Sequence, residues 1–524
     1  MRQRKLWGWG YDGEGVEPAE REALTAALKS RFPDHEPQDA QPPRREDLNL
    51  PEPRVSLPSV LAGLGSSELV ERATHAYGKS YRDLVRSLRG LFGHPPDVVA
   101  RPRNESDVTA LLEWCADAKV AAIPYGGGTS VVGGVEPVVG DSYSGTVSID
   151  LGRLDRVLEI DSVSGLARIQ GGTLGPSLEE QLQPHGLTLR HYPQSFELST
   201  LGGWIATRSA GHHAILHTHV DDLVASVRTI TPAGVFQTRR LPASGAGPAP
   251  ERLIIGSEGA FGIVTEAWMR VRERPRFREG AAATFESFDR GVAAARALAR
   301  SDLYPATCRL LDQTEALLAG AGDGVRSVLL ISFESHDHAL GPWVDRAVEL
   351  SSDYGGESSP GRSRGSPAEA WRRAFLRAPH LRDEMIRIGF TVETFETAVV
   401  WSGLSQLIES VREGVEAAAP EAMLMVRLTH AYPDGAAPYF TVIAPAPPGA
   451  EVERWDEIKA AASDAILARG GTITHHHAVG RDHRAWYDQE RPEPYAEALR
   501  AAKQALDPSW ILNPGVLLDP PDGS

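Results

Sequence analysis

A run of three histidines, His475, His476 and His477, stands near the end of the chain. Imidazole titrates close to neutral pH, so such a run suits proton transfer at carbon, and it also suits metal binding. In an extended segment His475 and His477 would share a face, and His476 would point the opposite way. The alternative interpretation is a polar run that faces solvent.

A tyrosine and an arginine earlier in the chain could act beside these histidines. Tyr432 follows the apolar run of residues 423–428 and could present its phenol to a pocket, whereas a packed core position is the alternative. Arg382 could clamp a phosphate or a carboxylate with two parallel hydrogen bonds, whereas a surface ion pair is the alternative. Either role requires a binding site that these side chains could face.

Glycine-rich clusters in the first half of the chain could form that site. The first consists of Pro124, Tyr125, Gly126, Gly127, Gly128, Thr129, Ser130 and Val131, directly after a short apolar strand. Three glycines let backbone N–H groups converge, and two hydroxyls add donors, which suits a pyrophosphate. The cluster lacks the lysine of a Walker loop and the spacing of the Rossmann fingerprint.

Two further clusters pair glycines with hydroxyl residues. The second contributes Pro193, Gln194, Ser195, Ser199, Thr200, Gly202, Gly203, Ala206, Thr207 and Ser209. The third contributes Glu258, Gly259, Gly262, Ile263 and Val264. Any one cluster could be an ordinary turn, but three within about 140 residues favour a common binding site.

Composition restricts the classes of protein that could carry such a site. The chain has 524 residues, too many for one ordinary core, and 41% hydrophobic with 24% charged residues excludes a disordered chain. A formal charge of −16 makes nucleic acid an unsuitable partner. Only two cysteines, Cys115 and Cys308, exclude a disulfide framework and a cysteine-based metal site. No apolar run reaches the roughly 18 residues that cross a bilayer, and we expect a cytoplasmic protein.

The elements that must position these residues alternate along the chain, which predicts an α+β fold. Residues 104–118 and 368–378 are typical of helices, as are patches around residues 20–31 and 69–88. We divide the chain into an N-terminal helical segment with a proline-rich strap (1–90), a cofactor domain (91–275), a second mixed domain (276–480) and a C-terminal segment (481–524) that returns to the cofactor domain.

The order of the three clusters resembles the flavoprotein superfamily of vanillyl-alcohol oxidase and para-cresol methylhydroxylase. The resemblance implies a two-subdomain FAD-binding domain with a mixed α/β cap domain over the isoalloxazine ring. It assigns residues 125–131 to the pyrophosphate, and residues 193–199, 206–209 and 258–264 to the rest of FAD. Tyr125 and Thr129 stand where some members attach flavin covalently through His or Cys, so we expect non-covalent FAD.

Three motifs narrow the resemblance to the alkyldihydroxyacetonephosphate synthase family. They are Ser199-Thr200-Leu201-Gly202-Gly203-Trp204, the triple histidine with Ala478-Val479-Gly480, and the run from Arg427 to Tyr432. The family implies an exchange without net redox, in which flavin N5 forms an adduct with C1 of acyl-dihydroxyacetone phosphate. A fatty acid leaves and a long-chain fatty alcohol takes its place, in ether-lipid synthesis.

The same resemblance implies roles for single residues. Tyr432 matches the proton donor and acceptor, and His475, His476 and His477 match the essential histidine cluster. Arg382 matches a substrate-contacting arginine, and Arg309 matches another arginine needed for activity. We expect no metal and a homodimer, and peripheral contact with a membrane is left open. Tyr125, Ala478 and the absence of a peroxisomal address depart from the family pattern.

Two other functions fit parts of the sequence. In an FAD-linked 2-hydroxy-acid dehydrogenase of the D-lactate type, the cap histidines would hold a divalent metal and the flavin would accept a hydride. That class tends to show Glu-His-Gly where this chain has His476-His477-Ala478. A non-catalytic binding protein would leave the histidines and Tyr432 idle.

Overall fold

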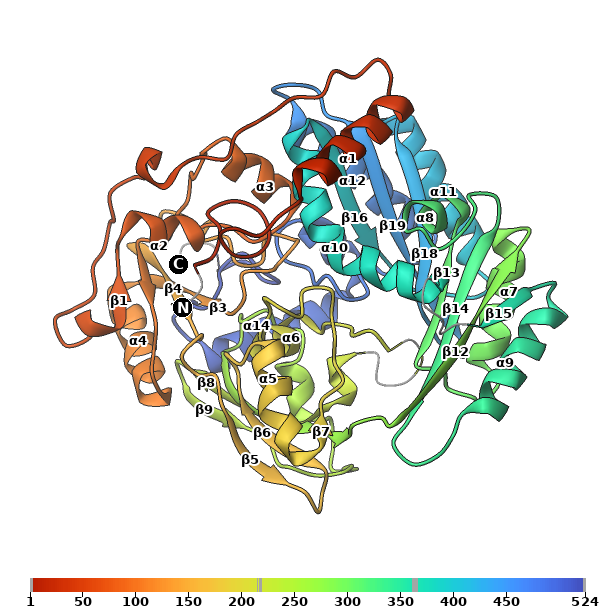
Figure 1. Ribbon diagram of the computed structural model, residues 1–524. Coiled ribbons are helices and arrows are strands. Elements are labelled where there is room, and N and C mark those ends of the chain that lie inside the picture. The colour runs from red at the N-terminus through yellow and green to blue at the C-terminus, as the bar shows by residue number, and fades with distance from the viewer. Residues whose placement is uncertain (1–2, 214, 216–218, 361–365, 522–524) are drawn as a thin grey trace.

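The computed structural model describes residues 3–213, 215, 219–360 and 366–521. Its first sheet has four strands in the order β1-β2-β4-β3; Figure 1 labels β1, β3 and β4 of this sheet. These strands are β1 (Gly65–Ser66), β2 (Val98–Ala100), β3 (Val120–Tyr125) and β4 (Gly145–Asp150), and β4 is parallel to both β2 and β3. The helix expected over 104–118 is α4 (Glu105–Ala118), and the Asn104 side chain caps it by accepting from the Asp107 N–H at 2.9 Å.

A second sheet of five strands follows, in the order β5-β6-β10-β8-β9 with antiparallel neighbours. Its strands are β5 (Val157–Asp161), β6 (Leu166–Gln170), β8 (Val224–Thr231), β9 (Gly234–Gln237) and β10 (Ile263–Arg270). Apolar residues of α5 (Gly175–Leu182), α6 (Leu201–Thr207) and α14 (Glu493–Leu506) share a core with this sheet. The short strands β7 (Leu187–Thr188) and β11 (Arg272–Glu273) pair beside it.

The third sheet has eight strands and belongs to the second half of the chain. Its main path runs β15 (Glu357–Pro360), β12 (Phe277–Phe285), β14 (Ser327–Ser335), β13 (Thr307–Leu311), β18 (Met423–Ala431), β19 (Gly435–Pro445) and β16 (Phe390–Glu396), and β17 (Val399–Val400) pairs with β19. Helices α7 (Phe288–Ala299), α9 (Gly341–Asp353), α11 (Leu404–Ala418) and α12 (Glu451–Ala468) bury their apolar residues on one face.

The other face of this sheet is covered by α1 (Pro18–Arg31), α8 (Gln313–Leu318) and α10 (Pro367–Arg387) (Figure 1). Because side chains alternate along a strand, Leu310 and Leu428 face the first core while Arg309 and Arg427 face the opposite way. This second face therefore looks toward the two smaller sheets.

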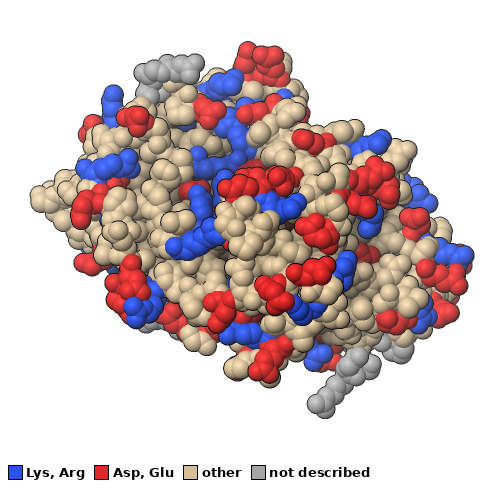
Figure 2. All heavy atoms as spheres, turned by 90° about the horizontal axis from the view of Figure 1, so that it is seen from above, with Lys and Arg blue, Asp and Glu red and all other residues tan. Residues whose placement is uncertain are grey.

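The N-terminal segment crosses from the third sheet to the first. The expected helical patch at 69–88 is two helices, α2 (Leu69–Thr74) and α3 (Tyr81–Leu88). They are separated at Gly78, where a Cβ would lie 2.3 Å from the Ser130 carbonyl oxygen. Among the described helices, none combines the length and the apolar run that a membrane crossing needs. Figure 2 shows acidic and basic side chains intermingled over one face of the molecule.

Candidate functional site

A cavity of about 440 Å³ lies between the three sheets and is lined by loops from all of them. The residues named one by one for the three glycine-rich clusters all line this cavity, whereas residues 196–198, 208 and 260–261 of the ranges assigned to flavin do not. Arg309, Arg382, His476 and His477 line it as well. The structure thus brings most of the predicted site residues together around one cavity. Two of them, Tyr432 and His475, do not line it.

The first glycine-rich loop follows β3 and contains backbone N–H groups that are not used within the described part of the protein. Among the described residues, the backbone N–H groups from Gly127 to Val131 have no acceptor. A Cβ on Gly127 would lie 1.9 Å from the Leu198 carbonyl oxygen, and one on Gly128, at φ +63°, would lie 1.9 Å from the Tyr125 hydroxyl. Unused amide donors on a loop that only glycine can form fit a pyrophosphate of FAD.

The hydroxyls of the second loop are largely engaged within the protein. The Ser199 hydroxyl accepts from the Trp204 indole N–H at 2.7 Å. Thr200 caps α6 by accepting from the Gly203 N–H at 3.3 Å, and Ser209 lies 2.8 Å from the Nε2 atom of His191. These side chains therefore shape the loop, although they line the cavity.

Glu258, in the third loop, has a role that the sequence did not suggest. Burial raises the pKa of Glu258 to about 7, even though its side chain accepts from the backbone N–H groups of Val479 and Gly480 at 2.9 and 2.8 Å. Glu258 thereby joins the third flavin loop to the segment directly after the histidines.

A cationic wall faces the flavin loops from the third sheet and α10. Arg309, on β13, is 2% exposed, and its Nε and Nη1 atoms have no hydrogen-bond partner in the described chain. The guanidinium lies 4.1 Å from the ring centre of Trp371, and burial lowers the pKa of Arg309 to about 9. Arg427 and Arg382 also line the cavity. Buried guanidinium donors without partners are suited to an anionic ligand.

The three histidines stand in a loop that Glu396, at the end of β16, holds from below. The buried carboxylate accepts from the backbone N–H groups of His475, His476 and His477 at 2.6, 3.0 and 2.9 Å, and from the Thr474 hydroxyl at 2.7 Å. Burial alone would raise the pKa of Glu396, but its interactions with the histidine loop, which include the backbone N–H donor of His476, outweigh burial and hold the pKa well below its usual range. The loop conformation is thus set by one ionised side chain.

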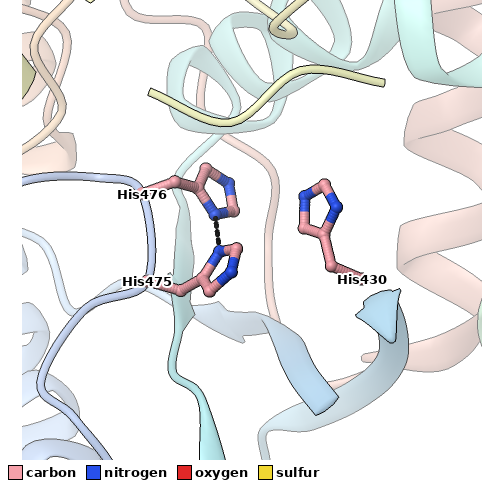
Figure 3. A group of neighbouring side chains, drawn as sticks. All are labelled: His430, His475 and His476. Carbon is pink, nitrogen blue, oxygen red and sulfur yellow. Dashed lines mark hydrogen bonds between the residues drawn. The ribbon is translucent and has the colours of Figure 1, made fainter. Parts of the chain in front are cut away.

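Tyr432 is connected to the cavity by contacts with two of the histidines. Its hydroxyl lies 2.6 Å from Nε2 of His475, and Nδ1 of His475 lies 2.9 Å from Nδ1 of His476, which lines the cavity. Figure 3 shows this imidazole pair facing His430, which lies at the end of β18 and whose ring stacks on that of His475. The Nε2 atom of His219 lies 3.0 Å from Nε2 of His475.

Burial keeps this chain of side chains neutral. It lowers the pKa of His476 to about 3 and that of His477 to about 4, although Glu396 acts in the opposite direction. It also lowers the pKa of His475 well below its usual range. Neutral imidazoles donate through one nitrogen and accept through the other, so Tyr432, His475 and His476 can pass a proton along the chain.

The same side chains leave a geometric basis for the metal-dependent alternative. The ligand atoms of His430, His475 and His476 lie within 4.8 Å of one another, and so do those of Glu396, His476 and His477. Glu396 already accepts four hydrogen bonds from the loop. A site without metal remains our prediction.

Several residues of the site were missed by the sequence-based interpretation. Glu396, His430, Arg427, Tyr439 and Lys79 were given no role, although they line the cavity or hold its histidines. The charged residues within apolar strands could have revealed most of these positions, because a charged side chain is buried only where it has a partner. For Lys79, which lies in an irregular segment, no comparable signal exists.

Comparison with known proteins defines the class first. Residues 96–239 match the model of an FAD binding domain, and residues 274–517 match the model of the C-terminal domain of FAD linked oxidases. The fold is similar to that of p-cresol methylhydroxylase with bound substrate, with a TM-score of 0.68 at 12% identity over 96% of this chain and 98% of that chain. The protein is an FAD-dependent enzyme with the fold of the vanillyl-alcohol oxidase type.

Similarity to individual proteins then narrows the family. Alkyldihydroxyacetonephosphate synthase of Trypanosoma brucei brucei is 31% identical over 86% of this chain and 78% of its own length. The synthase of Dictyostelium discoideum is 32% identical over 85% of this chain and 77% of its own length. A solved alkyldihydroxyacetonephosphate synthase matches with a TM-score of 0.81 at 26% identity, over 97% of both chains. The chain belongs to the alkyldihydroxyacetonephosphate synthase family.

Proposed function

We propose that this enzyme exchanges the acyl group of acyl-dihydroxyacetone phosphate for a long-chain fatty alcohol, without net oxidation or reduction. The observation that carries the proposal is the face that α10 presents to the cavity. Trp371, Phe375 and Ala378 form an apolar stretch along that face, and Arg382 follows one turn later. A substrate that joins an acyl chain to a phosphate needs both kinds of surface along one wall.

The cationic residues suit the phosphate end of such a substrate. Arg309 offers two partnerless guanidinium nitrogens, and Arg382 has a partnerless Nε atom among the described residues. Lys79 lines the cavity near Arg382, and burial lowers its pKa to about 8, so it is largely protonated at neutral pH. A phosphate that enters this wall would supply the acceptors that the wall lacks.

The balance of bonds requires no oxidant. The C1–O bond to the fatty acid breaks, a C1–O bond to the alcohol forms, and the alcohol proton is released. FAD, which the three glycine-rich loops would hold, would supply the reactive N5 atom for this exchange. The residues of this chain bind the two ends of the substrate, exclude water, and remove and return a C1 proton at His476, with Tyr432 and His475 behind it.

The test is an incubation with acyl-dihydroxyacetone phosphate and hexadecanol, with and without oxygen. We expect fatty acid and alkyl-dihydroxyacetone phosphate in equal amounts by mass spectrometry, with no oxygen consumed and no dye reduced. Arg382→Lys keeps the charge but loses the planar fork, so we expect mainly a raised KM. Reduction of a dye by D-lactate, with no alkyl product, would instead establish the dehydrogenase.

A further inference from the structure

The first residues of the chain form a closed loop against the cavity. In this N-terminal loop (residues 3–12), Arg4 pairs with Tyr11 in an isolated β-bridge, and the Asp12 N–H donates to the Gln3 carbonyl at 2.9 Å. The indole N–H of Trp7 donates to the Leu84 carbonyl at 2.7 Å. The loop is therefore anchored on the protein by its own hydrogen bonds.

The N-terminal loop also contacts the cap helix. The backbone N–H of Trp9 donates to the Asp383 carboxylate at 2.5 Å, and the Trp9 side chain lines the cavity. Gly8, at φ +82°, could not carry a Cβ there, because that atom would lie 2.6 Å from the same carboxylate. One side of the loop is thus fixed to α10, next to Arg382.

The other side of the loop carries Arg4 to the flavin loops. Its Nη1 atom donates to the Gly127 carbonyl, and its Nη2 atom lies 3.5 Å from the Leu198 carbonyl oxygen. These two carbonyls belong to the first and second glycine-rich loops, which pack backbone against backbone at this point. Two carbonyl dipoles that converge repel one another unless a donor lies between them, and a guanidinium offers donors to both.

We propose that Arg4 is a positioning residue for FAD, which holds the pyrophosphate loop (125–131) against the second flavin loop (193–199). The guanidinium keeps the unused N–H groups from Gly127 to Val131 in a conformation ready for phosphate, and its charge offsets that of the bound anion. The N-terminal loop thereby joins the three glycine-rich loops as a fourth component of the cofactor site. The inference rests on FAD binding alone and is independent of the reaction proposed above.

Arg45 supports the N-terminal loop, so its replacement provides a second test variant. Arg45 donates to the backbone carbonyl of Arg4 at 3.0 Å and to Asp12 at 2.8 Å. Within the described part of the chain, the ion pairs of Arg44, its neighbour in sequence, are exposed contacts with Glu46 and Asp47. Arg44→Met is therefore a matched control that removes one guanidinium from the same segment without touching the N-terminal loop.

The experiment measures the Kd of FAD for apoprotein by flavin fluorescence, together with the Tm of each apoprotein. We expect Arg4→Met to raise the Kd about tenfold or more, because two charge-assisted contacts are lost. Arg4→Lys, which can reach only one carbonyl, should give an intermediate Kd, and Arg45→Met a smaller increase. Arg44→Met should stay within about twofold of wild type.

Three results would overturn the proposal. The first is a Kd within twofold of wild type for Arg4→Met. The second is an equal rise for Arg4→Met and the Arg44→Met control. The third is a lowered apoprotein Tm with unchanged Kd, which would show that Arg4 stabilises only the fold. Since no substrate is present, none of these results bears on the proposed reaction.

Discussion

Replacing Glu396 by glutamine should separate catalysis from cofactor binding. The carboxylate accepts four of the hydrogen bonds that hold the histidine loop: one oxygen accepts the His475 N–H at 2.6 Å, and the other accepts the remaining three. Glutamine has nearly the same shape but only one acceptor oxygen. If that oxygen keeps its three partners, the amide group faces the His475 N–H with another N–H, and His475 must move.

The magnitude follows from that single lost contact. A hydrogen bond to a charged group contributes about 1.5–3 kcal/mol, and the buried donor left behind adds a similar penalty, so we expect a loss of about 3 kcal/mol in the free energy of unfolding. Displacement of His475 breaks its 2.6 Å contact with the Tyr432 hydroxyl. Loss of acid–base help then lowers kcat by about 10²-fold or more.

Glu393→Gln is the matched control on the same strand. Glu393 is buried and pairs with Lys459 at 3.0 Å and with the Trp455 indole N–H at 2.7 Å, but it lies outside the cavity lining. Breaking this buried pair should cost about 3–5 kcal/mol of stability. Glu393→Gln should therefore be at least as unstable as Glu396→Gln and yet retain its kcat at a temperature below both transitions.

Three measurements on Glu396→Gln and Glu393→Gln test this prediction: turnover of the alkyl exchange, FAD content and urea unfolding. We expect Glu396→Gln to retain FAD, because its carboxylate contacts none of the three glycine-rich loops. A Glu396→Gln enzyme with kcat within threefold of wild type would refute the idea that this side chain positions the histidines. Equal losses of kcat in both variants would attribute the effect to stability.

Four further outcomes are expected. Acid precipitation should release all yellow flavin into the supernatant, and flavin in the pellet would contradict non-covalent binding. Gly127→Ala, whose Cβ would meet the Leu198 carbonyl oxygen at 1.9 Å, should lower Tm and FAD content, whereas Gly140→Ala, with nothing within 4 Å, should change neither. Burial lowers the pKa of His191 to about 3, so its stabilising effect is present above pH 6.5 and is lost as the pH falls toward 3. The unfolding free energy of His191→Gln should therefore fall less steeply as the pH is lowered, by up to about 1.4 kcal/mol per pH unit. Urea titrations at several pH values measure this slope. Tyr432→Phe should lower kcat about 10²–10⁴-fold at a cost of about 1 kcal/mol in stability; near wild-type turnover at saturating substrate would contradict its role.

The cofactor loops are the part of the site that the sequence indicates most directly, because their information is local. A loop that needs several glycines and hydroxyls shows this in its composition, and the residues named for the three glycine-rich clusters line one cavity. The role of each residue was less predictable. Ser199 and Glu258, both predicted to contact FAD, line the cavity, and they also accept hydrogen bonds from the protein: Ser199 from Trp204, and Glu258 from the backbone of Val479 and Gly480. Composition alone does not distinguish a ligand contact from a contact that shapes the loop.

Helix ends and strand alternation set the limits of prediction in the second half. The helix expected to end at residue 378 continues to Arg387 through Pro379, because Asp383 and Ile386 are buried beyond it. A register shift between Leu428 and His430 interrupts the alternation of β18, so Thr429 and His430 both line the cavity. Tertiary packing decides both features, and neither leaves a local pattern.

Two carboxylates connect the histidine loop to the rest of the site, and on the proposed mechanism they would link cofactor binding to proton transfer. Glu396 holds the front of the loop from the third sheet, while Glu258 holds its end from the third flavin loop. We therefore expect a change that displaces Glu258 to disturb Val479 and Gly480, which directly follow the histidines in the chain. Burial raises the pKa of Glu258 to about 7, and the backbone N–H groups of Val479 and Gly480 act against this shift because they donate to its carboxylate. Loss of these two donors would therefore weaken the ionised form of Glu258. Substitutions at Glu258 should consequently affect both FAD affinity and turnover, whereas those at Glu396 should affect turnover alone.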